Sequence, residues 1–211
     1  MINGIESSSF IIIAFIAFLG AMTPGPNFVI VTKNTLAYSK KTGLYTSLGI
    51  FFGVLIHIAY SLIGLDFLTE ESVLLYNCIK YCGAAYLIYF GMTSIFGNSS
   101  TKITFNVKHE KIDLNSSQGF RSGFITNILN PESSIFYLSV FSQVVEPQTS
   151  YIIQICYGLE MALISFLWFV FLTYVLSYQG LRKRLANIQH YIDNGLGLVL
   201  IGCGVRLALL Y

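Results

Sequence analysis

The sequence has very little charge. Only 12 Lys and Arg and 10 Asp and Glu residues occur among its 211 residues, so charged residues make up 10% of the chain. A soluble domain usually carries about 25%, so this chain lacks the polar surface that a water-facing fold needs. The formal net charge of +2 is too small to indicate nucleic acid, and no nucleic-acid partner is predicted.

Cysteine is also scarce, and the placement of the cysteines argues against a metal-binding or redox-active pair. The four cysteines lie inside apolar stretches without Cys-x-x-Cys spacing, as is typical of buried thiols that behave as small hydrophobes: Cys78, Cys82, Cys156 and Cys203. We predict no metal site and no cofactor. No room remains for a separate catalytic domain beside the apolar runs described next, so the chain is not predicted to be an enzyme.

Long apolar runs dominate the sequence, which is 55% hydrophobic. A membrane-spanning helix needs roughly 20 apolar residues, and six runs approach or exceed that length. They predict an all-α integral membrane protein in contact with lipid, with six transmembrane helices in one transporter domain over residues 1–211. The runs are Phe10–Val31, Leu44–Leu65, Val73–Phe96, Phe120–Val145, Tyr151–Val175 and Ile192–Leu210.

The chain divides into two similar halves around a polar segment. Residues 97–119 form the predicted cytoplasmic loop, between repeat one (about 8–96) and repeat two (about 120–211). The first helix of each half carries a mid-span proline after a polar residue, Thr23-Pro24 and Asn130-Pro131. Three helices cross a membrane an odd number of times, so the second copy is inverted. Two inverted three-helix repeats with broken helices 1 and 4 are the plan of many secondary transporters.

Basic residues mark alternate loops. They follow the first, third and fifth runs, whereas the loops after the second and fourth runs contain acidic residues and no Lys or Arg. The positive-inside rule then places the basic loops in the cytoplasm and both termini outside it. The basic residues are Lys40, Lys41, Lys102, Lys108, Lys111, Arg121, Arg182, Lys183 and Arg184.

The two proline breaks are the predicted substrate site. Proline removes a backbone N–H and clashes with the preceding turn, and the carbonyls it frees must be covered by protein or line a wet cavity. Polar side chains lie beside both breaks at helical spacing. A packing kink is the alternative reading. The predicted substrate-binding residues are Thr23, Pro24, Gly25, Asn27, Asn127, Asn130, Pro131 and Ser134.

Two ionisable residues are candidates for coupling. Glu160 lies deep in the fifth run, where a carboxylate is costly and usually faces a cavity or a partner. It is a candidate to carry a proton or to bind a substrate amine. His57 is a candidate proton relay, or alternatively an interhelical hydrogen-bonding group. It belongs to a stripe of small and polar residues that more often serves close helix packing: Thr46, Gly49, Gly53, His57, Ser61 and Gly64.

These motifs, in this order, resemble the lysine-exporter (LysE/RhtB) family of amino-acid efflux proteins. The resemblance covers nearly the whole chain and is carried mainly by Thr23-Pro24-Gly25-Pro26-Asn27 and Asn127-Ile128-Leu129-Asn130-Pro131. It implies export of amino acids or close derivatives from a bacterial inner membrane, driven by the proton motive force. Two positions depart from the family: Asn27 stands where many members carry Asp, and Glu132 where Lys is common.

Two other functions are alternatives to transport. A passive small-solute channel fits the same helices without coupling. A membrane thiol–disulfide oxidoreductase needs a reactive cysteine pair, typically on the two broken helices, and those helices contain no cysteine. The substrate is a small molecule whose identity the sequence does not determine, and homo-oligomerisation stays open.

Overall fold

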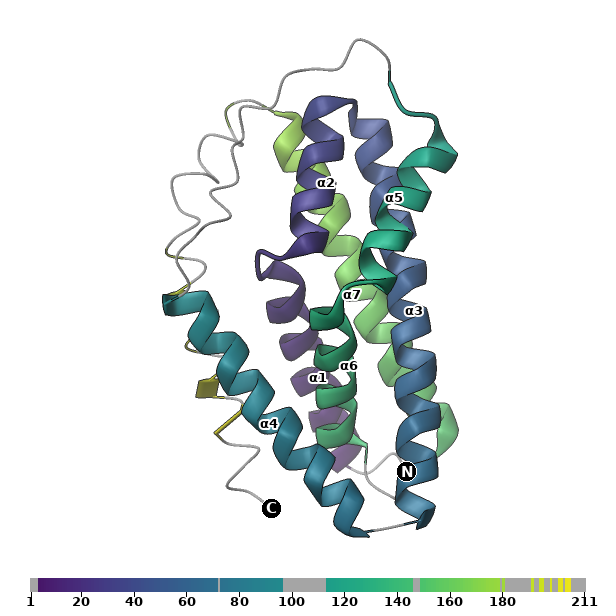
Figure 1. Cartoon of the computed structure of the whole chain (residues 1–211), viewed down its shortest axis with the longest axis vertical. Coiled ribbons are helices and arrows are strands. Elements are labelled where there is room, and N and C mark those ends of the chain that lie inside the picture. Colours follow the sequence, from purple (N-terminus) through teal and green to yellow (C-terminus); the bar gives the residue numbers. More distant parts are fainter. Residues whose placement is uncertain are drawn as a thin grey trace.

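The computed structural model describes residues 4–71, 73–96, 113–145 and 149–178, with separate positions between 180 and 205. Within these residues the regular structure is helical throughout (Figure 1). Most of the predicted 97–119 loop and of the predicted sixth helix lies outside the described residues. The helices are α1 (Gly4–Met22), α2 (Pro26–Ala37), α3 (Lys40–Glu71), α4 (Val73–Phe96), α5 (Ser116–Ile128), α6 (Pro131–Val144) and α7 (Tyr151–Ser177).

Both predicted helix breaks are present. The first divides α1 from α2, whose axes differ by 58°, and the second divides α5 from α6 at Leu129 and Asn130. Pro26 and Pro131 are the first residues of α2 and α6. Proline is favoured at that position, because the missing N–H would have no intrahelical partner anyway and its fixed φ suits a helix start. Each of these two prolines therefore begins the helix that follows the break.

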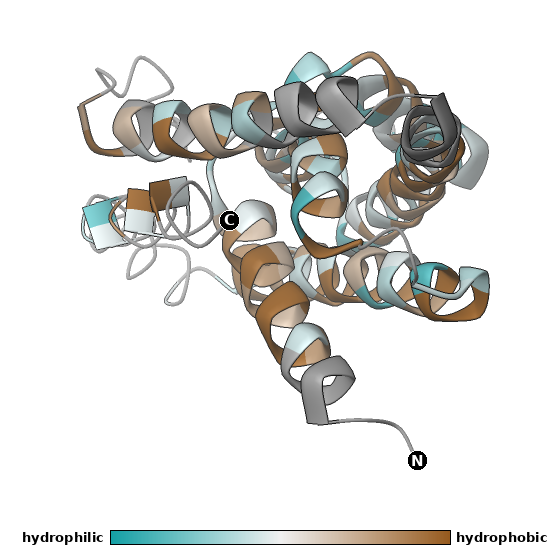
Figure 2. Ribbon diagram, turned by 90° about the horizontal axis from the view of Figure 1, so that it is seen from below, coloured by the Kyte–Doolittle hydropathy of each residue, from teal (hydrophilic) through white to brown (hydrophobic). Residues whose placement is uncertain are grey.

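The described helices include candidates for membrane spans. Lys40–Gly64 within α3 and Tyr151–Ser177 are long and apolar enough to cross a bilayer, and α1 with α2 adds a third if the bent pair forms one span. Large apolar side chains face outward, with Ile11 and Ile152 exposed by 71% and 75%. Figure 2 shows apolar residues along the helices seen end-on. An all-helical membrane protein is consistent with these features, whereas the six-span inverted repeat stays a prediction.

Segments predicted to share one side of the membrane lie at one end of the bundle. The turn between α2 and α3, the residues before α5 and the end of α7 meet there (Figure 1). Ser39 Oγ donates to Asp113 Oδ2 at 2.6 Å, and Lys40 Nζ lies 3.6 Å from the centre of the Tyr174 ring. This clustering is the arrangement that alternating basic loops require.

Glycines bring α3 and α5 into backbone contact. A Cβ at Gly49 would overlap the carbonyl oxygen of Phe120, and one at Gly123 would overlap that of Thr46. Gly53 faces the Asn127 side chain in the same way, whereas a Cβ at Gly64 would have no atom within 4 Å. The small-residue stripe of α3 therefore packs helices along most of its length, which is the more common role of such stripes.

Asp113 fastens the segment before α5 to the start of α3. Its carboxylate accepts hydrogen bonds from Ser39 Oγ and, at 2.8 Å, from Thr42 Oγ1. These two hydrogen bonds, first that of Ser39 and then that of Thr42, hold the pKa of Asp113 below its usual range. A carboxylate whose folded pKa is lowered stabilises the fold above its unfolded pKa, and the contribution is lost as the pH falls through the folded pKa.

We therefore expect Asp113→Asn to lower the melting temperature at neutral pH, because a neutral amide accepts these hydrogen bonds less strongly than a carboxylate. The loss in stability is about 1 kcal/mol or less, since the group is exposed and water screens it. The difference from wild type should shrink as the pH falls through the lowered pKa of folded Asp113, where the carboxylate becomes protonated. The measurement is the melting temperature of both proteins across pH. A difference independent of pH would contradict a role for the carboxylate charge.

Candidate functional site

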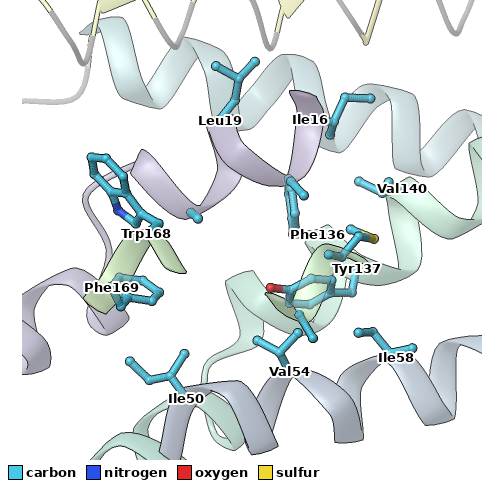
Figure 3. Packing of buried hydrophobic residues seen from close by; sticks show 14 of the residues in the cluster. Ile16, Leu19, Ile50, Val54, Ile58, Phe136, Tyr137, Val140, Trp168 and Phe169 are labelled. Atoms are coloured by element: carbon cyan, nitrogen blue, oxygen red, sulfur yellow. The ribbon is translucent and has the colours of Figure 1, made fainter. Parts of the chain in front are cut away.

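A small polar cavity lies where the two helix breaks meet. Its volume is about 40 Å3, and a water molecule needs roughly 10–15 Å3 of such space, so it holds only a few. The breaks supply most of its polar wall, and α3 and α7 close it with Val54, Ser165 and Phe169; Figure 3 shows Val54 and Phe169 with Phe136 and Tyr137. The lining residues are Gly20, Ala21, Thr23, Gly25, Asn27, Val54, Asn130, Glu132, Ser133, Phe136, Tyr137, Ser165 and Phe169.

The structure brings half of the predicted substrate residues to this cavity. Thr23, Gly25, Asn27 and Asn130 line it. The remaining four belong to the same two breaks without being lining residues: Pro24, Asn127, Pro131 and Ser134. Segments more than a hundred residues apart in sequence thus form one polar centre, the juxtaposition that a site shared between two breaks requires.

Ser133 is the centre of the polar cluster. Its hydroxyl oxygen lies within hydrogen-bonding distance of three side-chain amide nitrogens, those of Asn130 (3.0 Å), Asn27 (3.2 Å) and Asn127 (3.4 Å). A hydroxyl oxygen has two acceptor lone pairs, so the three amides compete for it. Within the described residues, the side-chain oxygens of Asn27 and Asn127 are buried without a hydrogen-bond partner. The cluster therefore has unused hydrogen-bonding capacity.

Two helices begin at the cavity and run toward opposite ends of the bundle, α2 and α6 (Figure 1). The N-terminus of α6 is capped, since Asn130 Oδ1 accepts from the Glu132 N–H at 3.1 Å. At the N-terminus of α2 the capping residue is Gly25, which offers no side-chain cap. The first N–H groups of a helix carry partial positive charge, so both ends favour a negative group.

Thr23 repairs the end of α1. The Oγ1 and the backbone N–H of Thr23 both donate to the carbonyl oxygen of Leu19, at 2.9 and 3.2 Å. Pro24 and Pro26 have no N–H, so the carbonyls of Gly20 and Met22 lose their helical donors. Gly20 lines the cavity. The break thus leaves the carbonyl of Gly20, a lining residue, without its helical donor, while Thr23 is occupied by the backbone.

His57 ties α3 to the second break. Its Nε2 donates to the carbonyl oxygen of Asn127 at 2.9 Å, and because a carbonyl can only accept, this nitrogen carries the proton. Its Nδ1 faces the Tyr60 hydroxyl and, at 3.4 Å, Ser134 Oγ. The ring stacks on Tyr137, which lines the cavity. His57 is thus the interhelical hydrogen-bonding group weighed from sequence; proton relay stays a prediction.

Glu160 lies apart from the cavity, on α7. It is half-buried, and Oε2 is buried without a hydrogen-bond partner among the described residues. It is absent from the lining, to which α7 contributes Ser165 and Phe169. The structure therefore does not bring Glu160 to the breaks, and a coupling role for it is a proposal separate from substrate contact.

Several lining residues were not predicted as site residues, among them Glu132, Ser133 and Tyr137. Ser133 lies three residues after Asn130, a spacing that places two side chains on one helical face. Ser134, at a spacing of four, was the residue predicted from the sequence instead. The cavity is reached by Ser133, whereas Ser134 Oγ bonds back to the carbonyl oxygen of Asn130 at 3.3 Å.

The described residues form a helical bundle with membrane-span candidates and a polar cavity between two broken helices, which is consistent with the class of all-helical membrane proteins. A family model described as LysE type translocator matches residues 18–210. The chain belongs to this family. No solved structure matches it.

Its relatives cover nearly its whole length. The chain is 31% identical over 201 residues to an uncharacterised membrane protein, YrhP, of Bacillus subtilis, covering 92% of this chain and 95% of the relative. It is 30% identical over 198 residues to a leucine efflux protein of Salmonella typhimurium, covering 90% and 89%. The membrane protein YahN of Escherichia coli is 26% identical over 184 residues, covering 87% and 82%. These similarities support amino-acid export.

Proposed function

We propose that this protein is a secondary active transporter that exports amino acids or close derivatives across the bacterial inner membrane, driven by the proton motive force. The polar cavity shared by the two helix breaks is the observation that carries the proposal. Interrupted helices that meet at a polar site are the usual substrate-binding device of such transporters. Membership of a translocator family and a relative named as a leucine efflux protein support the same function.

Alternating access is the transport mode that we propose for this site. In the described conformation the cavity between the two breaks has room for a few water molecules. We propose that the two predicted inverted repeats rock against each other, with α2 and α6 as the elements that move at the breaks. The substrate binds between the two breaks, near Asn27 and Asn130.

The proposed substrate is an amino acid with an apolar side chain. Three lining residues, Val54, Phe136 and Phe169, give the cavity an apolar wall opposite its amides. Asn27, where many family members carry Asp, leaves no fixed charge on the first break. A leucine-like side chain fits the apolar wall, whereas a second cationic group would not.

The orientation is proposed from charge. The bundle end that carries Lys40 and Lys41 faces the cytoplasm, and both termini lie on the other side of the membrane. Export then carries substrate from that basic end, past the breaks, to the opposite end.

Reconstituted vesicles test the function directly. We expect purified protein in liposomes to exchange labelled leucine for internal leucine with saturation, and to accumulate it when a proton gradient is imposed. A passive channel would instead equilibrate leucine without accumulation and with little saturation. Protein-free liposomes are the control. The twenty proteinogenic amino acids are each tested in the same way. If the vesicles behave like the control with every one of them, the proposal of amino-acid export is wrong.

Glu160→Gln tests proton coupling. A glutamine keeps the shape and hydrogen-bonding atoms of the side chain and cannot take up a proton. We expect it to abolish accumulation driven by a proton gradient while leucine exchange and the melting temperature stay near wild type. Unchanged accumulation in this variant would show that Glu160 does not carry the coupling proton and has a structural role.

A further inference from the structure

Glu132 occupies a position in the cavity that its sequence context did not reveal. It is the second residue of α6, and its backbone N–H is held by the Asn130 side chain. Its carboxylate lies over the other break, since a Cβ at Gly25 would be 3.0 Å from Glu132 Oε2. A residue of the second break thus reaches across to the first.

No described residue of the cavity wall offers Glu132 a cationic side chain. Among the described lining residues it is the only Asp or Glu, and none is Lys, Arg or His. Glu132 is exposed, so its carboxylate is open to a ligand. The helix N-termini at the cavity favour a negative group, and the Glu132 carboxylate is the one described lining group that favours a positive one.

A second, independent acceptor belongs to a residue that lines the same cavity. Asn27 uses its amide nitrogen on Ser133, and its side-chain oxygen is buried without a partner among the described residues. An ammonium group has three N–H donors and no acceptor. Its donors match a carboxylate and an unpaired amide oxygen, and they add no further donor to the crowded Ser133 hydroxyl.

We propose that Glu132 binds the ammonium group of the exported amino acid, with Asn27 Oδ1 as the second acceptor. This rests on the proposed transport function and adds the chemistry that selects the substrate. The free amine becomes the recognised group, so amino acids bind and the corresponding carboxylic acids, which lack the amine, bind weakly. Glu132 is then a binding residue, distinct from the proton-carrying role of Glu160.

The test is a comparison of ligands in purified wild type, Glu132→Gln, Glu132→Asp and Glu160→Gln. Leucine is compared with 4-methylpentanoate, which has the same carbon chain and carboxylate without the amine. We expect Glu132→Gln to raise the Kd for leucine by about tenfold or more, the usual scale for a hydrogen bond to a charged group. Its Kd for 4-methylpentanoate should stay at the weak wild-type value. Glu132→Asp, which keeps the charge, should lose less, and Glu160→Gln should bind leucine as wild type does.

Two results would overturn this inference without overturning the proposed function. One is wild-type leucine affinity in a folded Glu132→Gln protein, and the other is an equal loss of affinity for leucine and for 4-methylpentanoate. The melting temperature of each variant shows that it is folded, and Glu132→Asp keeps the test decisive if Glu132→Gln does not fold. In that case a loss for leucine alone supports the inference, and unchanged affinity despite the shorter side chain opposes it. Wild-type protein that binds none of the twenty amino acids would instead overturn the proposed function.

Discussion

Replacing Gly123 by Ala is expected to destabilise the protein strongly. The new Cβ would overlap the backbone carbonyl of Thr46, and a backbone atom cannot move aside by changing rotamer. The helices α3 and α5 would have to separate, and overpacking of this kind costs about 1–3 kcal/mol. This outweighs the gain of roughly 1 kcal/mol that Ala brings over Gly in a helix. Gly49→Ala, which meets the carbonyl of Phe120, should behave in the same way.

Gly64→Ala is the matched control on the same stripe. Its Cβ would have no atom within 4 Å, so only the gain in helix propensity remains, and the melting temperature should stay the same or rise. Thermal denaturation of the three variants in detergent, beside the yield of folded protein, makes the comparison. Equal melting temperatures for Gly123→Ala and Gly64→Ala would show that the glycine contacts do not hold α3 against α5.

Asn27→Ala and Asn130→Ala are expected to weaken amino-acid binding by about 1–3 kcal/mol each, the cost of leaving buried polar partners unpaired. Both residues line the cavity, and both donate to the Ser133 hydroxyl. Residues that share a partner are energetically coupled, so the loss in the double variant should differ from the sum of the two single losses. The measurement is the Kd for leucine in the three purified variants, with their melting temperatures.

Asn34→Ala separates binding from folding. Asn34 is 2% exposed and its amide bonds to Thr46 and Ser122 at 2.9 and 3.1 Å, outside the cavity. We expect this variant to melt at a lower temperature while its Kd for leucine stays near wild type. If Asn27→Ala and Asn130→Ala show the same pattern as Asn34→Ala, the breaks shape the fold and the substrate binds elsewhere.

The sequence by itself determined the elements and where they break. Pro24 and Pro131 act through covalent structure, since a missing N–H and a fixed φ interrupt a helix whatever surrounds it. The apolar runs determined an all-helical chain, and the motifs around both breaks identified the family that the whole-chain comparison confirms. Glycine spacing on α3 indicated close packing because a helical stripe places small residues on one face.

Only the tertiary structure decided which side chains face the cavity. Helical periodicity groups residues on a face without saying what that face meets, so Ser134 was predicted from the sequence and Ser133, which lines the cavity, was missed. The same limit applies to Glu160, whose depth in an apolar run does not reveal that the α7 lining consists of Ser165 and Phe169. Glu132 lies beside Gly25 only because two breaks about a hundred residues apart in sequence come together in space. No local sequence pattern predicts such a long-range contact.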